Sequence, residues 1–123
     1  MAYILLNQLK VYQLSVEFSD LAWKIYKGLG WQLKKIIGDQ FITSIDSVGS
    51  NIAEGYGRYH YLDKIKFYYN ARGSLFESKH WIDLLYRREI INREKYLQLV
   101  KKYKDIQIGL NSLINSTYKK KSE

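Results

Sequence analysis

The 123-residue chain contains no cysteine and no proline, and basic residues outnumber acidic ones, 20 against 12. Without cysteine there is no disulfide framework, no thiolate metal site and no cysteine nucleophile, which fits a reducing compartment. Proline breaks helices and is common in loop-rich β domains, so its absence favours long helices with short connections. Purely apolar runs such as residues 2–6 are too short to span a bilayer, and residues 1–10 do not resemble a signal peptide. We therefore expect a soluble, cytoplasmic protein with one domain.

Hydrophobic residues recur at spacings of three and four along four segments, which is the period of one helix face. The spacing predicts helices over residues of about 7–29, 39–54, 61–87 and 92–117. Asp39, which follows Gly38, is the predicted N-cap of the second helix, and Asn92 is the predicted N-cap of the fourth. In the third helix, polar groups interrupt a broad apolar stripe, whose positions are Leu62, Ile65, Tyr69 and Phe76 together with Tyr68, Leu75, Ile82 and Leu85.

The short connections between these segments imply that neighbouring helices are antiparallel. The sequence therefore predicts an all-α protein, an up-down-up-down antiparallel four-helix bundle over residues 1–118. The basic residues 119–123 are expected to form a frayed tail.

The predicted second helix has no lysine or arginine and carries many small side chains. Small side chains allow another helix to approach closely, whereas a surface helix usually carries charges at such positions. We therefore expect this helix to be buried on more than one side and to need a partner in an oligomer. The small residues concerned are Ser44, Ser47, Gly49, Ser50 and Ala53.

The most distinctive stretch contains three short motifs between residues 44 and 77. Asn-Ile-Ala-Glu-Gly covers 51–55, Gly-Arg covers 57–58, and Ala-Arg-Gly-Ser covers 71–74, with Glu77 three residues later. This order and spacing resemble the four-helix-bundle proteins encoded within 23S rRNA intervening sequences, also labelled S23 ribosomal proteins. The resemblance implies a four-helix protomer, assembly into ring-shaped homopentamers and no established catalytic activity. A more distant resemblance in fold is to the accessory proteins of diversity-generating retroelements, which bind a reverse transcriptase.

The motif residues are candidates for a structural network or a subunit interface. Glu54 lies near the C-terminus of a helix, where the helix dipole disfavours a negative charge by up to about 1 kcal/mol. Arg58 or Arg72 is its expected partner. A network that joins the turn to the third helix and a set of separate surface ion pairs, each worth about 0–1 kcal/mol, are both open. The candidate residues are Asn51, Glu54, Gly55, Gly57, Arg58, Arg72, Ser74 and Glu77.

No motif in the sequence predicts catalysis, a cofactor or a metal. Glu77 and His80 form one Glu-x-x-His pair, but a di-iron bundle needs two such pairs, and three residues before the other histidine, His60, stands a glycine. The glycines at 55 and 57 lack the Gly-Lys-Ser/Thr ending of a phosphate loop and follow a helix instead of a strand. No nucleophile elbow occurs. We therefore expect a non-enzymatic protein with no small-molecule substrate and no membrane role.

The formal net charge is +8, and residues 92–123 hold eight basic against three acidic residues, a net +5. One hypothesis is that this segment binds RNA or DNA phosphates, with some of the twelve tyrosines stacking on bases. The other is a protein–protein adaptor or assembly module, for example one like the reverse-transcriptase accessory proteins, whose charge serves only solubility. The candidate nucleic-acid contacts are Arg93, Lys95, Lys101, Lys102, Lys104, Lys119, Lys120 and Lys121.

Overall fold

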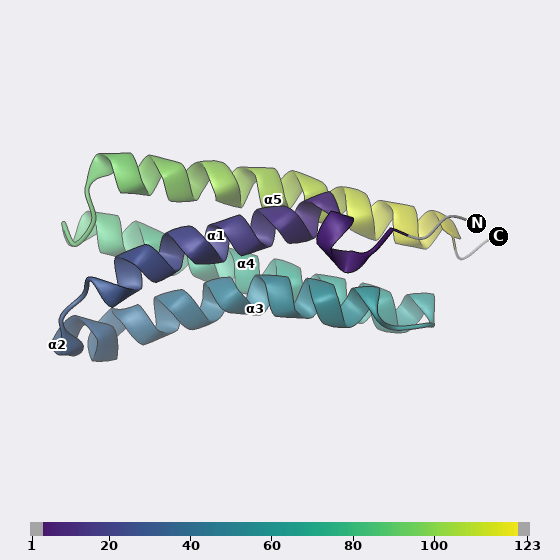
Figure 1. Ribbon diagram of the computed structural model, residues 1–123, viewed down its shortest axis with the longest axis horizontal. Coiled ribbons are helices and arrows are strands. Elements are labelled where there is room, and N and C mark those ends of the chain that lie inside the picture. The colour runs from purple at the N-terminus through teal and green to yellow at the C-terminus, as the bar shows by residue number, and fades with distance from the viewer. Residues whose placement is uncertain (1–3, 121–123) are drawn as a thin grey trace.

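The computed structural model describes residues 4–120, which contain helices and no strand. Four long helices lie side by side (Figure 1), namely α1 (Lys10–Lys27), α3 (Asp39–Tyr56), α4 (Tyr61–Arg87) and α5 (Arg93–Lys120). Three short elements accompany them: the 3-10 helix η1 (Leu6–Gln8), α2 (Trp31–Leu33) and the π-helical turn η2 (Lys34–Gly38). The prediction of an all-α bundle of four helices is confirmed.

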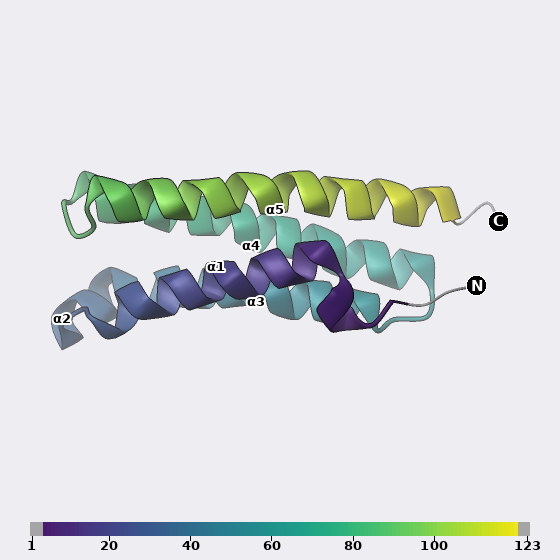
Figure 2. The same cartoon turned by 45° about the horizontal axis from the view of Figure 1, so that its top comes forward.

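The colour path in Figures 1 and 2 shows that successive long helices run in opposite directions, so that α1 begins and α5 ends at the same end of the molecule. Each long helix contacts two others, because α1 lies against α3 and α5, and α4 lies against the same two helices. The core between them consists of aliphatic and aromatic side chains at helical spacing, such as Phe18, Ile45, Leu75 and Ile106, all fully buried.

The buried serines do not disturb this apolar core. Ser15, Ser44 and Ser78 each donate a hydrogen bond to the carbonyl three residues earlier in their own helix. A buried hydroxyl that is bonded in this way avoids the cost of an unsatisfied polar group. No side-chain nitrogen or oxygen buried within residues 4–120 lacks a hydrogen-bond partner.

The small residues of α3 let it approach two neighbouring helices. A Cβ atom at Gly49 would lie 2.9 Å from the Ser15 hydroxyl of α1, and one at Gly55 would lie 2.7 Å from the Tyr68 ring of α4. The expected burial on more than one side is therefore observed. The helices that cover these two glycines belong to the same chain, so Gly49 and Gly55 give no reason of their own to expect an oligomer.

The prediction that a helix begins with Asp39 as its N-cap is wrong. The helical segment begins at Trp31, is capped by extended Gly30, and continues through α2 and η2 into α3. Gly38 has helical backbone angles (φ −59°, ψ −42°), and a Cβ there would lie 3.0 Å from Leu29. This glycine permits close packing and does not break the helix, whereas Asp39 accepts a hydrogen bond from the Tyr26 hydroxyl at 2.6 Å.

The other helix boundaries are close to those predicted. Helix α1 begins at Lys10, after the 3-10 turn, and α4 covers 61–87 as expected. The Asn92 side chain accepts a hydrogen bond from the Lys95 backbone N–H at 2.9 Å, which confirms the predicted N-cap of α5. Lys119 and Lys120, expected in a frayed tail, form the end of α5, and Lys121 lies outside the described residues.

Candidate functional site

The end of α3 and the turn that leads to α4 contain the first two motifs, whose charged groups are at the surface. The Glu54 carboxylate lies 3.7 Å from the Arg58 guanidinium, and both side chains are about half exposed. Arg58 also lies over the Phe67 ring of α4, 4.8 Å from its centroid. The expected pairing of Glu54 with Arg58 is present, and its exposure makes it worth about 0–1 kcal/mol.

Lys64, which sequence reasoning missed, ties this turn to α4. Its ammonium group donates to the backbone carbonyl of Tyr56 at 2.8 Å and approaches that of Gly55 at 3.4 Å. These carbonyls belong to the last turn of α3, where a positive charge is favourable. A lysine in the first turn of a helix that follows a tight connection is the signal that could have identified this contact.

Three further motif residues, Asn51, Arg72 and Glu77, contact groups within their own helices. Asn51 donates to the Ser47 carbonyl of α3 at 2.9 Å. Arg72 lies over the rings of Tyr69 and Phe76, at 5.7 and 5.6 Å, and Glu77 accepts a hydrogen bond from the Trp81 indole at 2.9 Å. The polar contacts of Asn51, Glu54 with Arg58, and Glu77 are thus each with a residue four positions away. The hydrogen bonds between the end of α3 and α4 come from Lys64, which is outside the motifs.

Glu77 and His80 are both engaged with Trp81. The Glu77 carboxylate accepts a hydrogen bond from the indole N–H of Trp81. The His80 ring meets the Trp81 ring edge-on, with 4.8 Å between the ring centroids. Within residues 4–120, no three or more histidine, aspartate and glutamate side chains are grouped so that they could hold a metal ion.

An exposed apolar row runs along the side of α4 that faces away from the core. Leu62, Tyr69 and Phe76 follow one another at intervals of seven residues, and they are 64%, 44% and 45% exposed. Gly73 lies on the same side, with open space where a Cβ atom would be. Of the broad apolar stripe predicted for this helix, these three positions are exposed, and the other five, Ile65, Tyr68, Leu75, Ile82 and Leu85, are buried. Helix α4 has apolar residues on two sides, and only the side with Ile65 and Leu75 faces the core.

Two of the basic residues predicted to bind nucleic acid already pair with carboxylates. Lys101 pairs with Asp105 of its own helix at 3.0 Å, and Lys102 pairs with Glu17 of α1 at 2.6 Å. The hydrogen bond and charge of Lys102 lower the pKa of Glu17. The other predicted contacts that the structure describes are all exposed: Arg93, Lys95, Lys104, Lys119 and Lys120.

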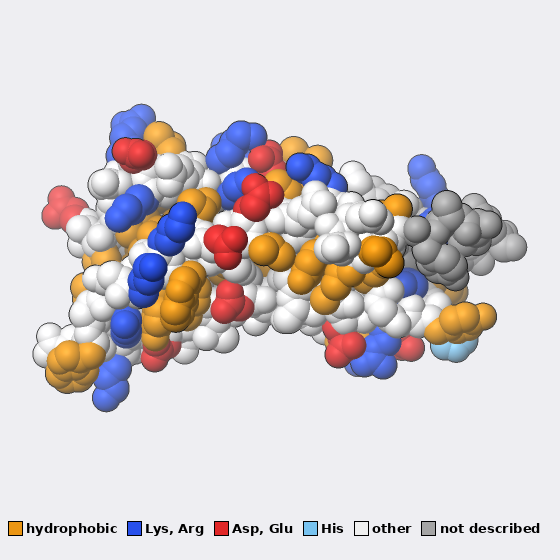
Figure 3. Space-filling view, in the orientation of Figure 1, with side chains coloured by type: hydrophobic (Ala, Val, Ile, Leu, Met, Phe, Trp, Pro, Cys, Tyr) orange, Lys and Arg blue, Asp and Glu red, His pale blue; other side chains and the backbone are white. Residues whose placement is uncertain are grey.

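A second group of basic residues, which was not predicted from the sequence, lies where α1 ends and α2 begins. This lysine–tryptophan cluster has two exposed indoles, because Trp23 is 53% and Trp31 is 69% exposed. Lys34 lies over the Tyr26 ring, which stacks on Trp23, and Lys35 lies over Trp31. Figure 3 shows lysine and arginine side chains beside hydrophobic ones at this end. The density of lysine and tryptophan between residues 23 and 35 is a signal that could have revealed the cluster, whose four lysines are Lys24, Lys27, Lys34 and Lys35.

No helix within residues 4–120 is long and apolar enough to cross a membrane. None of the curated proteins compared with the chain matches it. The chain is similar to a crystal structure of a protein with unknown function from the S23 ribosomal protein family of Bacteroides thetaiotaomicron VPI-5482. The two chains are 30% identical and superpose with a TM-score of 0.79 over 85% of this chain and 95% of the other. The family model described as 23S rRNA-intervening sequence protein matches residues 7–112. The chain therefore belongs to the 23S rRNA-intervening sequence protein family.

Proposed function

We propose that the protein is a non-enzymatic oligomeric scaffold whose subunits associate through the outward side of α4. The observation that carries this proposal is the exposed row of Leu62, Tyr69 and Phe76. A contiguous exposed apolar row on a folded helix is typical of a protein–protein interface. The family resemblance supports a homopentamer as the assembled form.

Other features of the same surface favour association. Gly73 lies between Tyr69 and Phe76 and leaves room for a neighbouring backbone to approach. Arg72 already lies across two aromatic rings, and a planar guanidinium in this position can also bind a carboxylate of a second subunit. Complete burial of a leucine or phenylalanine side chain is worth about 1.5–3 kcal/mol, so covering these half-exposed residues would contribute about 1 kcal/mol each.

Light scattering at micromolar concentration tests the assembly directly. We expect a mass near five times the 14.6 kDa of one chain. The double variant Leu62→Ser with Phe76→Ser should reduce this mass, and Ile108→Ser, which replaces an exposed apolar residue of α5, should not. A wild-type mass near that of one chain, or a fully assembled double variant that keeps the wild-type helical circular dichroism, would contradict the proposal.

A second proposed function, binding of RNA or DNA, is supported by the lysine–tryptophan cluster. Its lysines attract phosphates, and exposed indoles such as Trp23 and Trp31 offer faces on which unpaired bases can stack. The lysines of α5 are weaker candidates, since Lys101 and Lys102 already face carboxylates. In the competing adaptor role, the charge would serve only solubility.

Binding of a labelled rRNA fragment at increasing salt separates these roles. The double variant Lys34→Glu with Lys35→Glu should weaken binding and reduce the salt dependence by about one unit of slope for each lost phosphate contact. Lys101→Glu with Lys104→Glu is the matched control, because it changes the net charge equally. Absence of wild-type binding at about 100 mM salt would refute the proposal, since proteins with many phosphate contacts still bind there. Equal losses in both double variants would show that the cluster is not the site.

A further inference from the structure

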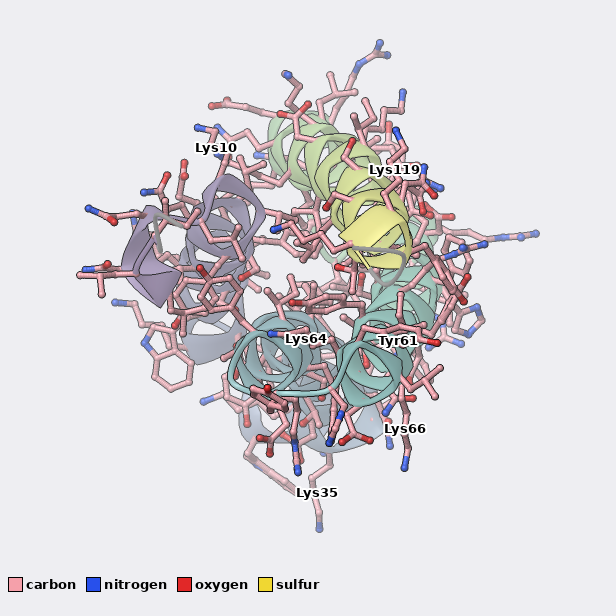
Figure 4. All side chains as sticks on the ribbon, turned by 90° about the vertical axis from the view of Figure 1, so that its right-hand side faces the viewer. Lys10, Lys35, Tyr61, Lys64, Lys66 and Lys119 are labelled. Atoms are coloured by element: carbon pink, nitrogen blue, oxygen red, sulfur yellow. The ribbon has the colours of Figure 1, made fainter. Side chains whose placement is uncertain are left out.

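A cavity of about 590 Å³ opens at the end of the bundle where α3 and α5 end and α4 begins. Figure 4 looks onto this end and shows Lys64 near its centre, while Lys66 lies at the outside. The volume falls within the range of about 300–1,000 Å³ that is usual for small-molecule sites. The argument for a ligand depends on the two lysines and four tyrosines that line it: Lys64, Lys120, Tyr56, Tyr59, Tyr61 and Tyr68.

The cavity has a strong positive bias. Lys64 and Lys120 both line it, and none of its described lining residues is an aspartate or glutamate. Burial, and secondarily the charge of Lys120, lower the pKa of Lys64. Lys64 directs two bonds to backbone carbonyls, and an ammonium group has three N–H donors, so one donor is left for a ligand. An anion between the two lysines would offset their repulsion.

The tyrosines add flat apolar faces and further hydrogen-bonding groups. Tyr68 is almost fully buried between α3 and α4, and burial raises its pKa to about 12. It therefore remains a neutral hydroxyl at physiological pH. Tyr59, by contrast, is almost fully exposed at the edge of the cavity, where its ring meets that of His60 edge-on. Aromatic rings around a positive centre suit a planar ligand that carries a negative group.

We propose that this cavity binds a phosphate monoester attached to a planar ring, which is the chemistry of a nucleotide. The phosphate lies between Lys64 and Lys120, and the ring lies against the tyrosines. This site is separate from the row on α4 and from the lysine–tryptophan cluster, so it does not depend on the functions proposed above. A free mononucleotide and the phosphorylated end of a nucleic-acid strand share this chemistry.

Isothermal titration of the full chain with uridine 5′-monophosphate, uridine and inorganic phosphate tests the proposal. We expect saturable binding of the nucleotide, and binding of uridine that is at least about tenfold weaker, because it lacks the charge-assisted hydrogen bonds. Lys120→Met should weaken nucleotide binding at least about tenfold. It lies at the exposed end of α5, where the fold does not depend on it. Lys66→Met removes an equal charge from an exposed position outside the cavity and should leave binding unchanged.

Lys64→Met has a structural effect of its own, because Lys64 also caps α3, so Tyr59→Ala serves as the second cavity variant. It should weaken binding of the nucleotide and leave binding of inorganic phosphate unchanged. A comparison of 5′-phosphorylated with unphosphorylated oligonucleotide identifies the source. If the oligonucleotide binds only with its terminal phosphate, and this binding is lost in Lys120→Met, the ligand is the phosphorylated end of a nucleic-acid strand. If neither the nucleotide nor the phosphorylated strand binds at millimolar concentration, or if Lys120→Met and Lys66→Met bind as the wild type does, the proposal is overturned.

Discussion

Replacing Gly55 by alanine tests whether the glycine of the Asn-Ile-Ala-Glu-Gly motif is needed for close helix packing. The added Cβ would lie 2.7 and 2.9 Å from two carbons of the Tyr68 ring and 3.0 Å from the Phe67 Cβ. Tyr68 is only 1% exposed, so its ring can move away from Gly55 only toward the cavity that it lines. Overpacking of this kind costs about 1–3 kcal/mol.

An opposing effect must be subtracted from this cost. Alanine is more favourable than glycine in a helix interior by about 1 kcal/mol, and less in a last turn such as this one. We therefore expect Gly55→Ala to lower the free energy of unfolding by about 1–2 kcal/mol, and the midpoint temperature by about 3–10 °C. Urea unfolding followed by circular dichroism, at one fixed protein concentration, measures the change.

Gly57 provides a matched control two residues away. It has ordinary backbone angles (φ −78°, ψ −9°), and a Cβ there would meet only the backbone oxygens of Ala53 and Glu54, at 3.6 and 3.7 Å. Gly57→Ala should therefore be neutral or stabilising by up to about 1 kcal/mol, through a less flexible unfolded state. If the two variants unfold at the same urea concentration, the packing argument for Gly55 is refuted.

Three further predictions concern single side chains. Glu89 has a left-handed backbone (φ 60°) between α4 and α5, so Glu89→Gly should stabilise the protein by about 1 kcal/mol in urea unfolding, and a loss of stability would contradict this strain argument. Asn92→Ala should cost about 1 kcal/mol by removing the N-cap of α5, whereas Asn92→Asp, which keeps the cap, should not. Because Lys102 lowers the pKa of Glu17, this carboxylate stabilises the fold above its ordinary pKa, and the contribution is lost as pH falls through the lowered value. Glu17→Gln should therefore reduce the change in urea midpoint between about pH 6 and about pH 3, while Asp20→Asn, an exposed carboxyl of the same helix, should reduce it less.

The four-helix fold could be predicted because it depends on local periodicity. Residues at spacings of three and four must share one side of a helix, and the bounds of α4 follow directly from such a pattern. The beginning of the second long helical segment could not be found in this way. Gly38 is compatible both with a helix break and with close packing, and only the positions of Tyr26 and Leu29 distinguish the two.

The candidate surfaces were harder to predict, because they depend on contacts between segments that are distant in sequence. Apolar residues at Leu62, Tyr69 and Phe76 fit a core stripe as well as an outward row, and only the packing of α4 on α3 and α5 decides between them. The same holds for charge. The sequence alone does not show that Lys102 pairs with Glu17, because this pairing depends on α1 lying beside α5.

Tyr68 connects the family motif to the proposed ligand site. Its ring contacts Gly55 on one side and forms part of the cavity wall on the other. A displacement of this ring would therefore change the shape of the cavity as well as the packing of α3 on α4. The residues of the outward row of α4 do not line the cavity, and we expect the row to be unaffected. A Gly55→Ala protein that still assembles but no longer binds a nucleotide would thus link the glycine of the motif to the ligand site as well as to the fold.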